Sequence, residues 1–140
     1  MGIKGLLYTR KKILFKEGDI IFKENAEDCK EMYIIDSGRV NIVKKVEDTD
    51  ISLTTLDEGD FFGEMSLITG SKRSASAIAH TKCKLHTMDK ETFEFNLSND
   101  IIFMRQILET LAHRLEETDT SLKRHIQRSA RLSKVFSATG

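Results

Sequence analysis

The stretch FFGEMSLITGSKRSASAIA, residues 61–79, carries two opposite charges that an ordinary core hairpin does not need. Glu64 and Arg73 stand on either side of one short connection. Gly63 lets the backbone come close to another group because it has no Cβ. Residues 64–68 are long enough for a helical turn, whose free N–H groups and positive dipole end suit a phosphate. The stretch therefore predicts a short helix, a return loop and a strand arranged around an anion.

Alternation along the following strand gives this site a hollow that contains a positive charge. A strand places every second side chain on one face, and here that face holds Arg73, Ala75, Ala77 and Ala79. Small alanines leave space, and an arginine forks two N–H bonds onto phosphate oxygens. Glu64 would repel a phosphate but is a strong acceptor for a hydroxyl. A ribose 2′-hydroxyl beside a cyclised 3′,5′-phosphate fits both charges, whereas the alternative is a Glu64–Arg73 ion pair with no ligand.

Outward from this stretch, the residues up to 88 have the pattern of short strands. Apolar, β-rich runs are separated by Gly, Asp and Glu, at residues 12–15, 20–22, 31–35, 39–43 and 51–56, with the acidic residues 47–50 before the last run. Such runs are typical of antiparallel hairpins in a roll or sandwich. The sequence EGDIIF at 17–22 recurs in shortened form as EGDFF at 58–62. We expect a β-roll that turns the same corner twice.

From residue 99 the apolar period changes from that of strands to that of a helix. Spacings of three and four form a heptad seam, at Ile101, Met104, Leu108, Leu111, Leu115, Thr118 and Leu122. Ser98, Asn99 and Asp100 are candidates for the N-cap. Because the chain contains no proline, we expect the helix to run to about residue 133, a length of ~50 Å at ~1.5 Å per residue.

A helix of this length cannot bury all of its surface against a small roll. The seam therefore predicts a partner helix, most simply the same helix of a second subunit in a homodimer. The alternative is an apolar stripe that lies only on its own roll. We expect three parts, namely a β-roll with flanking short helices over residues 1–98, a dimerisation helix over 99–134 and a tail over 135–140.

Composition and charge exclude several classes of protein. The chain of 140 residues balances 22 Lys and Arg against 22 Asp and Glu, which argues against nucleic-acid binding through a basic surface. No apolar run approaches the length of a membrane span, so we expect no membrane partner. Cys29 and Cys83 form no metal or redox spacing and indicate reduced thiols in a cytoplasmic protein, with packing as their role.

The sequence indicates a binding protein rather than an enzyme, and we assign no catalytic residue. His80 and His86 form no His-x-His pair, and His113 and His125 lie on the predicted helix. This spacing predicts no zinc or iron ligand set. No helix-turn-helix follows the long helix, so we expect no DNA-binding domain within this chain.

The motif FFGEMSL…KRSASAIA resembles the phosphate-binding cassette of cyclic nucleotide-binding domains. These domains occur in the bacterial catabolite activator, in regulatory subunits of cyclic-AMP-dependent kinase and in cyclic-nucleotide-gated channels. The resemblance covers about residues 12–122, and its matching positions are Gly18, Gly38, Gly59, the Gly63–Glu64 pair and the Arg73–Ser74 pair. The short spacing between Glu64 and Arg73 suits the cassette of the kinase type.

This resemblance implies an α+β fold. The expected architecture is an eight-stranded antiparallel β-roll, jelly-roll-like and of the double-stranded β-helix type. A short phosphate-binding helix, a small helix after Asp89 and a long C-terminal dimerisation helix would complete it.

The resemblance also implies a role for each matching residue. Glu64 would accept the ribose 2′-hydroxyl, and Arg73 would pair with the cyclic phosphate. The backbone N–H groups of Met65 and Ser66, together with the Ser74 hydroxyl, would complete the phosphate shell. The implied ligand-binding set in the cassette is Gly63, Glu64, Met65, Ser66, Arg73, Ser74 and Ala75.

Thr118 adds a prediction about the base. In the catabolite-activator type, a threonine–serine pair on the long helix reaches the adenine, and the serine comes from the partner subunit. Thr118 takes the threonine position here, but Asp119 replaces the serine, which weakens the case for a contact across subunits. The alternative is that Thr118 bonds its own helix backbone. A hydroxyl at Ser74 favours guanine in some relatives, whereas Thr118 favours adenine.

The sequence thus predicts a sensor that binds 3′,5′-cyclic AMP, with cyclic GMP as the second choice. Binding would be coupled to a rearrangement of the C-terminal helix in signal transduction. Two other functions stay open. The same scaffold could bind another effector, such as a cyclic dinucleotide or haem, or the chain could be a structural dimerisation module with no ligand.

Overall fold

The computed structural model describes residues 11–27 and 30–139, with the side chains of residues 121, 122, 125 and 129–139 outside the description. The predicted packing role of Cys29 lies outside the described residues. The chain forms two compact units, one ending at Phe103 and the other beginning at Met104.

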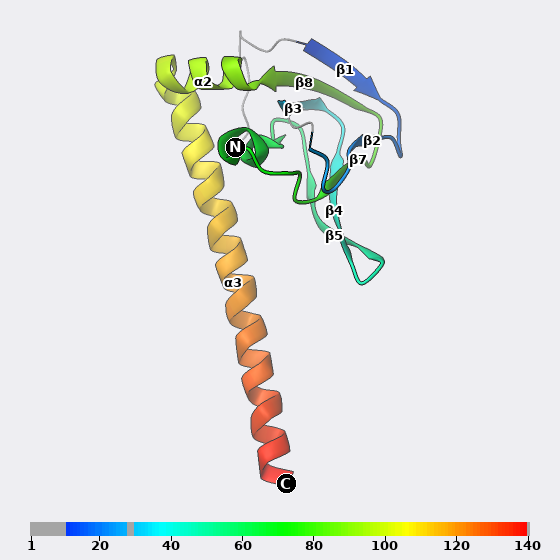
Figure 1. Cartoon of the computed structure of the whole chain (residues 1–140), viewed down its shortest axis with the longest axis vertical. Coiled ribbons are helices and arrows are strands. Elements are labelled where there is room, and N and C mark those ends of the chain that lie inside the picture. The colour runs from blue at the N-terminus through cyan, green and yellow to red at the C-terminus, as the bar shows by residue number, and fades with distance from the viewer. Residues whose placement is uncertain (1–10, 28–29, 140) are drawn as a thin grey trace. The chain divides into compact units, whose positions relative to one another are not determined.

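The first unit is the predicted antiparallel β-roll, built as two four-stranded sheets (Figure 1). The first sheet has the strand order β1 (Lys11–Phe15), β8 (Cys83–Asp89), β3 (Glu31–Ser37) and β6 (Phe61–Phe62). The second has the strand order β2 (Ile20–Phe22), β7 (Ser76–Ala79), β4 (Val40–Val46) and β5 (Thr49–Leu56). Pairs such as β1 with β8 and β2 with β7 join strands that are distant in sequence. This pairing confirms the jelly-roll-like arrangement.

Side chains from both sheets meet in one apolar core. Its buried members are Ile35, Val40, Phe62, Ala77, Ala79, Cys83 and Leu85. Alternation explains the selection, because every second side chain of β7 and β8 points to the same face of its sheet. The buried Cys83 thiol donates to the Arg39 carbonyl at 3.0 Å, so the packing role predicted for Cys83 is confirmed.

The repeated sequence turns the same corner twice, as predicted. In the first corner, Asp19 N donates to the Lys16 carbonyl at 3.0 Å, and Lys16 N donates to the Asp19 carboxylate at 2.8 Å. In the second corner, Asp60 N donates to the Asp57 carbonyl at 3.0 Å, and Asp57 N donates to the Asp60 carboxylate at 2.8 Å. The two corners share their bonds and distances, so the short repeat has a structural basis.

Each corner is also tied to a strand elsewhere in the roll through its glycine. Gly18 N donates to the Ala79 carbonyl at 2.8 Å, and Gly59 N donates to the Ile35 carbonyl at 2.8 Å. In both corners the strand residue returns a hydrogen bond of 2.9 Å to the carbonyl of the corner aspartate. The φ angles of the two glycines are 87° and 88°, left-handed values that a turn of this kind requires.

The acidic residues 47–50 do not separate β4 from β5 as predicted. Only Glu47 and Asp48 form the turn, and β5 already begins at Thr49. Both turn residues have positive φ, 50° and 63°, which is the type I′ geometry of a two-residue hairpin. The strand therefore starts earlier than predicted, at Thr49 rather than Ile51, and the hairpin extends beyond the rest of the roll in Figure 1.

Two short helices occur in the described part of the first unit. Helix α1 covers Glu64–Thr69 and follows β6, and helix α2 covers Lys90–Asn99 and follows β8. Asp89 caps α2, because its carboxylate accepts a hydrogen bond from Thr92 N at 2.8 Å. The small helix predicted after Asp89 is thus confirmed.

The long helix α3 covers Ile101–Thr139. Asp100 is its N-cap, since the Asp100 carboxylate accepts from the N–H groups of the second and third helical residues at 3.0 and 3.1 Å. We predicted a helix from about residue 99 to about residue 133, and one of the three N-cap candidates, Asp100, is the cap. The helix extends beyond its predicted end, and the tail expected over 135–140 is helical through residue 139. The reason is local, because no glycine or proline follows Gly70 before the last residue to end the helix earlier.

The heptad seam of α3 is largely exposed among the described side chains. Ile101 is 76% exposed, Leu108 is 60% exposed and Leu115 is 70% exposed. The side chain of Leu122 lies outside the description. Apolar side chains left in water forgo the free energy of burial, which is consistent with the predicted partner helix. The homodimer stays a prediction, because a single chain does not test it.

Candidate ligand-binding site

The predicted cassette forms a short helix between two glycines. Gly63 precedes α1 and Gly70 follows it, with φ of 82° and 72°, left-handed values that glycine adopts without strain. Gly70 N donates to the Ser66 carbonyl at 2.9 Å and closes the helix. The helix and its return loop therefore lie where the sequence predicted them.

Arg73 is almost fully buried and is held on three sides. Its exposed fraction is 4%. Nη1 donates to the Gly63 carbonyl at 2.8 Å, and Nη2 donates to the Glu31 carbonyl at 2.6 Å. The guanidinium carbon lies 4.2 Å from the centre of the Phe22 ring. Two hydrogen bonds and one ring face therefore fix the guanidinium beside the residue that precedes α1.

The backbone of Arg73 is bound to the connection that follows β2. Arg73 N donates to the Ala26 carbonyl at 3.1 Å, and Asn25 N donates to the Arg73 carbonyl at 2.8 Å. The ladder of β7 begins only at Ser76, so the predicted strand over 73–79 is wrong at its start. The alternation of side chains holds all the same, with buried side chains at Arg73, Ala75, Ala77 and Ala79.

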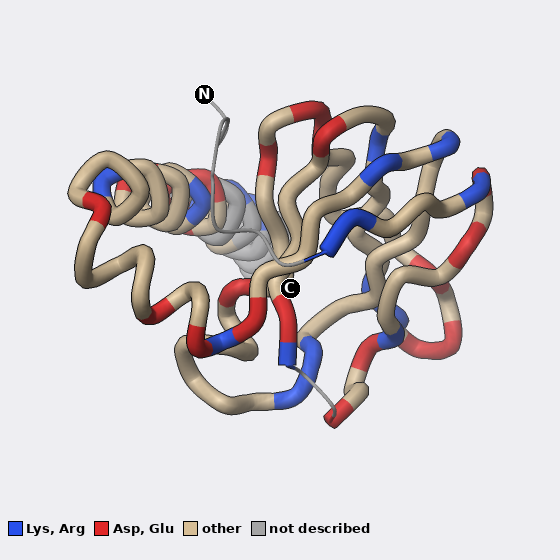
Figure 2. Tube along the Cα trace, turned by 90° about the horizontal axis from the view of Figure 1, so that it is seen from above, with Lys and Arg blue, Asp and Glu red and all other residues tan. Residues whose placement is uncertain are grey.

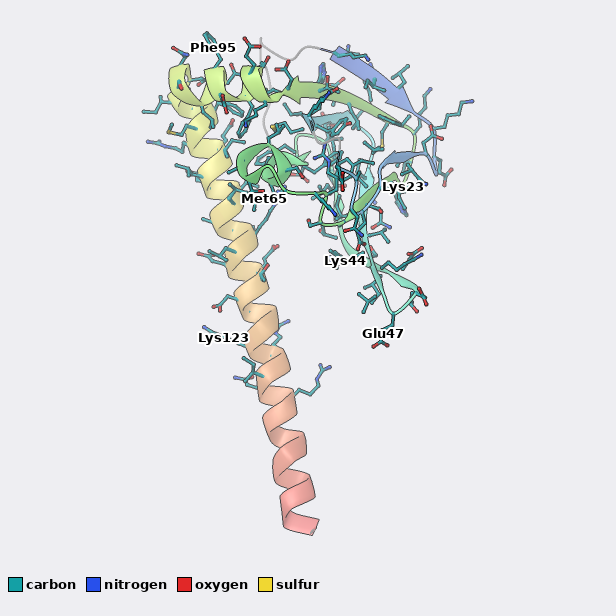
Figure 3. The ribbon with its side chains drawn as sticks, viewed as in Figure 1. Lys23, Lys44, Glu47, Met65, Phe95 and Lys123 are labelled. Carbon is teal, nitrogen blue, oxygen red and sulfur yellow. The ribbon has the colours of Figure 1, made fainter. Side chains whose placement is uncertain are left out.

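The other cassette residues divide between the interior and the surface. Glu64 and Ser66 are 2% and 6% exposed, whereas Met65, labelled on α1 in Figure 3, is 52% exposed. Ser74 is exposed. Its carbonyl accepts a hydrogen bond of 2.8 Å from Lys44 Nζ, which reaches it from β4.

The structure brings Glu64 and Arg73 into one neighbourhood. Gly63, whose carbonyl accepts from Arg73, is the residue directly before Glu64. Both charged side chains are buried. The positive end of α1 offsets part of the Glu64 charge. A buried cation and a buried carboxylate therefore occur at the same end of α1.

Thr118 lies in the second unit and is exposed on α3. Its hydroxyl donates to the Arg114 carbonyl at 2.9 Å, which is the backbone bond given above as the alternative to a base contact. Asp119 pairs with Lys123 at 3.2 Å. A contact between Thr118 and a base stays a prediction.

Sequence reasoning missed the ring of Phe22, which lies against Arg73, and the two aromatic rings packed beside it. Tyr33 stacks on Phe62 with ring centroids 5.2 Å apart, and Phe22 lies 5.9 Å from each of them. Burial raises the pKa of the Tyr33 phenol, the charge of Glu31 raises it further, and the charge of Arg73 lowers it. No local signal could have found Phe22, because it precedes Arg73 by more than a third of the chain.

Charged residues of both signs occur throughout the part of the chain that the structure describes (Figure 2). Figure 2 shows acidic and basic residues interspersed along the described chain rather than gathered in regions of one sign. Among the described side chains, no three or more His, Cys, Asp or Glu are placed to hold a metal ion. Within that same part of the chain, every helix is too short or too polar to cross a membrane.

Comparison with known proteins identifies the class to which this roll and its cassette belong. The family model described as the cyclic nucleotide-binding domain matches residues 12–100. The chain therefore belongs to the cyclic nucleotide-binding domain family, as the cassette motif predicted.

Two relatives show how widely the domain is used. The cAMP-dependent protein kinase regulatory subunit of Schizosaccharomyces pombe is 34% identical over 104 residues, which are 74% of this chain and 23% of that protein. The cyclic nucleotide-gated channel beta-3 of Homo sapiens is 38% identical over 95 residues, which are 66% of this chain and 12% of the channel. The chain thus spans less than a quarter of the length of either relative.

Solved structures agree with the fold. The catabolite activator protein of Thermus thermophilus matches with a TM-score of 0.74 and 28% identity, over 81% of this chain and 53% of that chain. An EAL enzyme in its cAMP-bound form matches with a TM-score of 0.61 and 31% identity, over 84% of this chain and 32% of that chain. The predicted α+β fold with a long C-terminal helix is confirmed.

Proposed function

We propose that this chain is a sensor that binds 3′,5′-cyclic AMP. The main support is the buried guanidinium of Arg73, fixed against the carbonyls of Gly63 and Glu31 at 2.8 and 2.6 Å. Carbonyl oxygens carry only partial charges, and a buried cation is stabilised far better by a full negative charge. A cyclic phosphate bound beside α1 supplies that charge.

Arg73 and Glu64 divide the ligand between them in this proposal. Arg73 binds the phosphate oxygens through its remaining N–H donors, and Glu64 accepts the ribose 2′-hydroxyl. The N–H groups of Met65 and Ser66 lie in the first turn of α1, where backbone donors have no intrahelical partner. They add donors to the same phosphate.

The other side of the phosphate is bound by the segment after Arg73. The Ser74 hydroxyl is a further donor, and the small side chain of Ala75 leaves room for the ligand. Gly63 lets the guanidinium of Arg73 come close to the backbone before α1. Lys44 binds the Ser74 carbonyl at 2.8 Å. The Ser74 carbonyl and the Ala75 N–H belong to the same peptide group, and in a trans peptide they point in opposite directions. Because the carbonyl binds Lys44, the Ala75 N–H points away from Lys44.

Adenine selectivity and the output of the sensor belong to the same proposal. Thr118 would exchange its backbone bond for a contact with adenine, whereas the Ser74 hydroxyl makes cyclic GMP the competing ligand. Two copies of α3 would pair through their exposed seam in a cytoplasmic homodimer. The ligand would favour the helix arrangement that closes over it. The proposed role is binding rather than catalysis.

Titration calorimetry tests the ligand directly, and it suits a chain without Trp. We expect cyclic AMP to bind more tightly than cyclic GMP, and both to bind far more tightly than 5′-AMP, whose phosphate is not cyclised. A cyclic dinucleotide that binds more tightly than cyclic AMP, or no heat with any of these nucleotides, would overturn the proposal. Sedimentation equilibrium with and without cyclic AMP tests the homodimer.

A further inference from the structure

The guanidinium of Arg73 is oriented by contacts that leave most of its donors unused by the described protein. A guanidinium has five N–H donors in one plane. The Gly63 and Glu31 carbonyls take one donor each, at 2.8 and 2.6 Å. These two bonds hold both terminal nitrogens, so the tilt of the plane depends on the side-chain torsions and on what lies against its face.

The ring of Phe22 lies against that face. The guanidinium carbon lies 4.2 Å from the ring centroid, well within the range of a cation–π contact. The negative face of the ring attracts the cation, and this attraction is strongest when water is excluded. With Arg73 only 4% exposed, the contact is largely dehydrated.

The Phe22 ring packs against two further aromatic rings. Tyr33 and Phe62 each lie 5.9 Å from Phe22, and they stack on one another at an interplanar angle of 15°. On the other side, a Cβ built on Gly63 would stand 2.8 Å from Arg73 Nη1 and 3.5 Å from a carbon of Phe22. Ring, glycine and guanidinium therefore form one closely packed unit.

We propose that Phe22 is a positioning residue for the phosphate of the ligand. Its ring face sets the tilt of the Arg73 guanidinium, so that the donors not used by Gly63 and Glu31 are presented to the phosphate oxygens together. This inference rests on the proposed function, because it concerns the geometry of the same anion site. Phe22 acts through Arg73 and does not touch the bound group itself.

A series of fluorinated phenylalanines at position 22 tests the role of the ring face. One, two and three fluorine atoms withdraw charge from the face step by step and change the shape of the ring very little. We expect the affinity for cyclic AMP to fall with each fluorine, by about 3- to 30-fold in total, the range of a buried cation–π contact. The melting temperature reports whether the core stays packed.

Phe93 gives a matched control, because its buried ring meets another ring rather than a cation. It lies edge to face with Phe103 at a centroid distance of 5.9 Å. Fluorination at 93 should leave the affinity for cyclic AMP unchanged. Among natural residues, Phe22→Tyr should retain affinity, whereas Phe22→Leu should lose it by a similar factor.

The outcomes separate this inference from the function on which it rests. An affinity that stays constant through the series, in a chain that binds cyclic AMP, overturns the role of Phe22 and leaves the proposed function standing. A parent chain that binds no cyclic nucleotide overturns both. Should the trifluorinated chain not fold, the affinities of Phe22→Tyr and Phe22→Leu for cyclic AMP are compared instead. Equal affinities in these two folded variants contradict the proposal.

Discussion

Replacing Arg73 by alanine is the most direct perturbation of the proposed site. The substitution deletes the cation that binds the phosphate, and truncating one partner of a buried charge pair costs about 2–5 kcal/mol of binding free energy. The affinity for cyclic AMP should therefore fall by roughly 30- to 5,000-fold. Titration calorimetry measures the loss.

The same substitution also affects folding, and this must be measured separately. Deleting the guanidinium leaves the carbonyls of Gly63 and Glu31 without the hydrogen bonds of 2.8 and 2.6 Å that Arg73 supplies. A fully buried carbonyl left unsatisfied costs about 1–3 kcal/mol, and these two, which are part-buried, cost less. We therefore expect a lower free energy of unfolding in urea, and binding should be measured where the variant is folded.

Arg73→Lys keeps the positive charge but loses the planar set of N–H donors that a guanidinium provides. A lysine is a point charge that cannot bind two phosphate oxygens in one plane, and a hydrogen bond to a charged group contributes about 1.5–3 kcal/mol. We expect an affinity between those of the parent and Arg73→Ala, lower than the parent by about 10- to 150-fold.

Arg39→Ala provides the matched control for this series. The Arg39 side chain is 62% exposed and pairs with Asp57 at 3.1 Å. Exposed pairs of this kind contribute less than about 1 kcal/mol, and no ligand contact is proposed for this one. Binding should be unchanged in this variant. If Arg73→Ala binds cyclic AMP as tightly as Arg39→Ala does, the assignment of the site is wrong.

Three further outcomes follow from the same geometry. Glu64→Gln should weaken binding of cyclic AMP but leave 2′-deoxy cyclic AMP unaffected in calorimetry, because only the former offers the hydroxyl; an equal loss for both ligands would contradict the role of Glu64. Gly63→Ala should lower the melting temperature and the affinity together, since its Cβ would lie 2.8 Å from Nη1 of the buried arginine at a φ of 82°; parent-like values would refute the close packing. The raised pKa of Tyr33 means that the folded chain holds this proton more tightly than the unfolded chain, so this contribution to stability is present below the usual pKa of 10.0 and lost as pH rises above it. Urea midpoints should therefore fall less steeply above about pH 10 in Tyr33→Phe than in the parent, and identical slopes would show that the phenol is not responsible.

The sequence was sufficient where the structure depends on local chemistry. The two EGD corners, the glycines on either side of α1 and the cap at Asp100, one of three candidates, are all specified by near neighbours in the chain. The alternation from Arg73 to Ala79 was also readable, because burial on a strand follows a period of two.

The predictions failed where the structure depends on backbone pairing between strands or on a residue distant in sequence. The β4–β5 turn is made by Glu47 and Asp48 in left-handed conformations that only the paired strands impose. The strand expected from residue 73 begins at Ser76, and the backbone of Arg73 pairs with the connection after β2 instead. Phe22 became visible only in three dimensions, because its contact with the guanidinium joins segments far apart in the chain.

The two corners, alike in sequence and bonding, differ in how much chain must be brought together to complete them. The bond from Gly18 to Ala79 closes a segment more than twice as long as the one closed by the bond from Gly59 to Ile35. The entropy of loop closure makes the longer segment costlier by about 0.8 kcal/mol. We therefore expect the second corner to form earlier in folding. The first corner should form only after β7, the strand that follows the phosphate cassette, is in place. Ordering of the N-terminal corner and of the binding segment would then be a single late event.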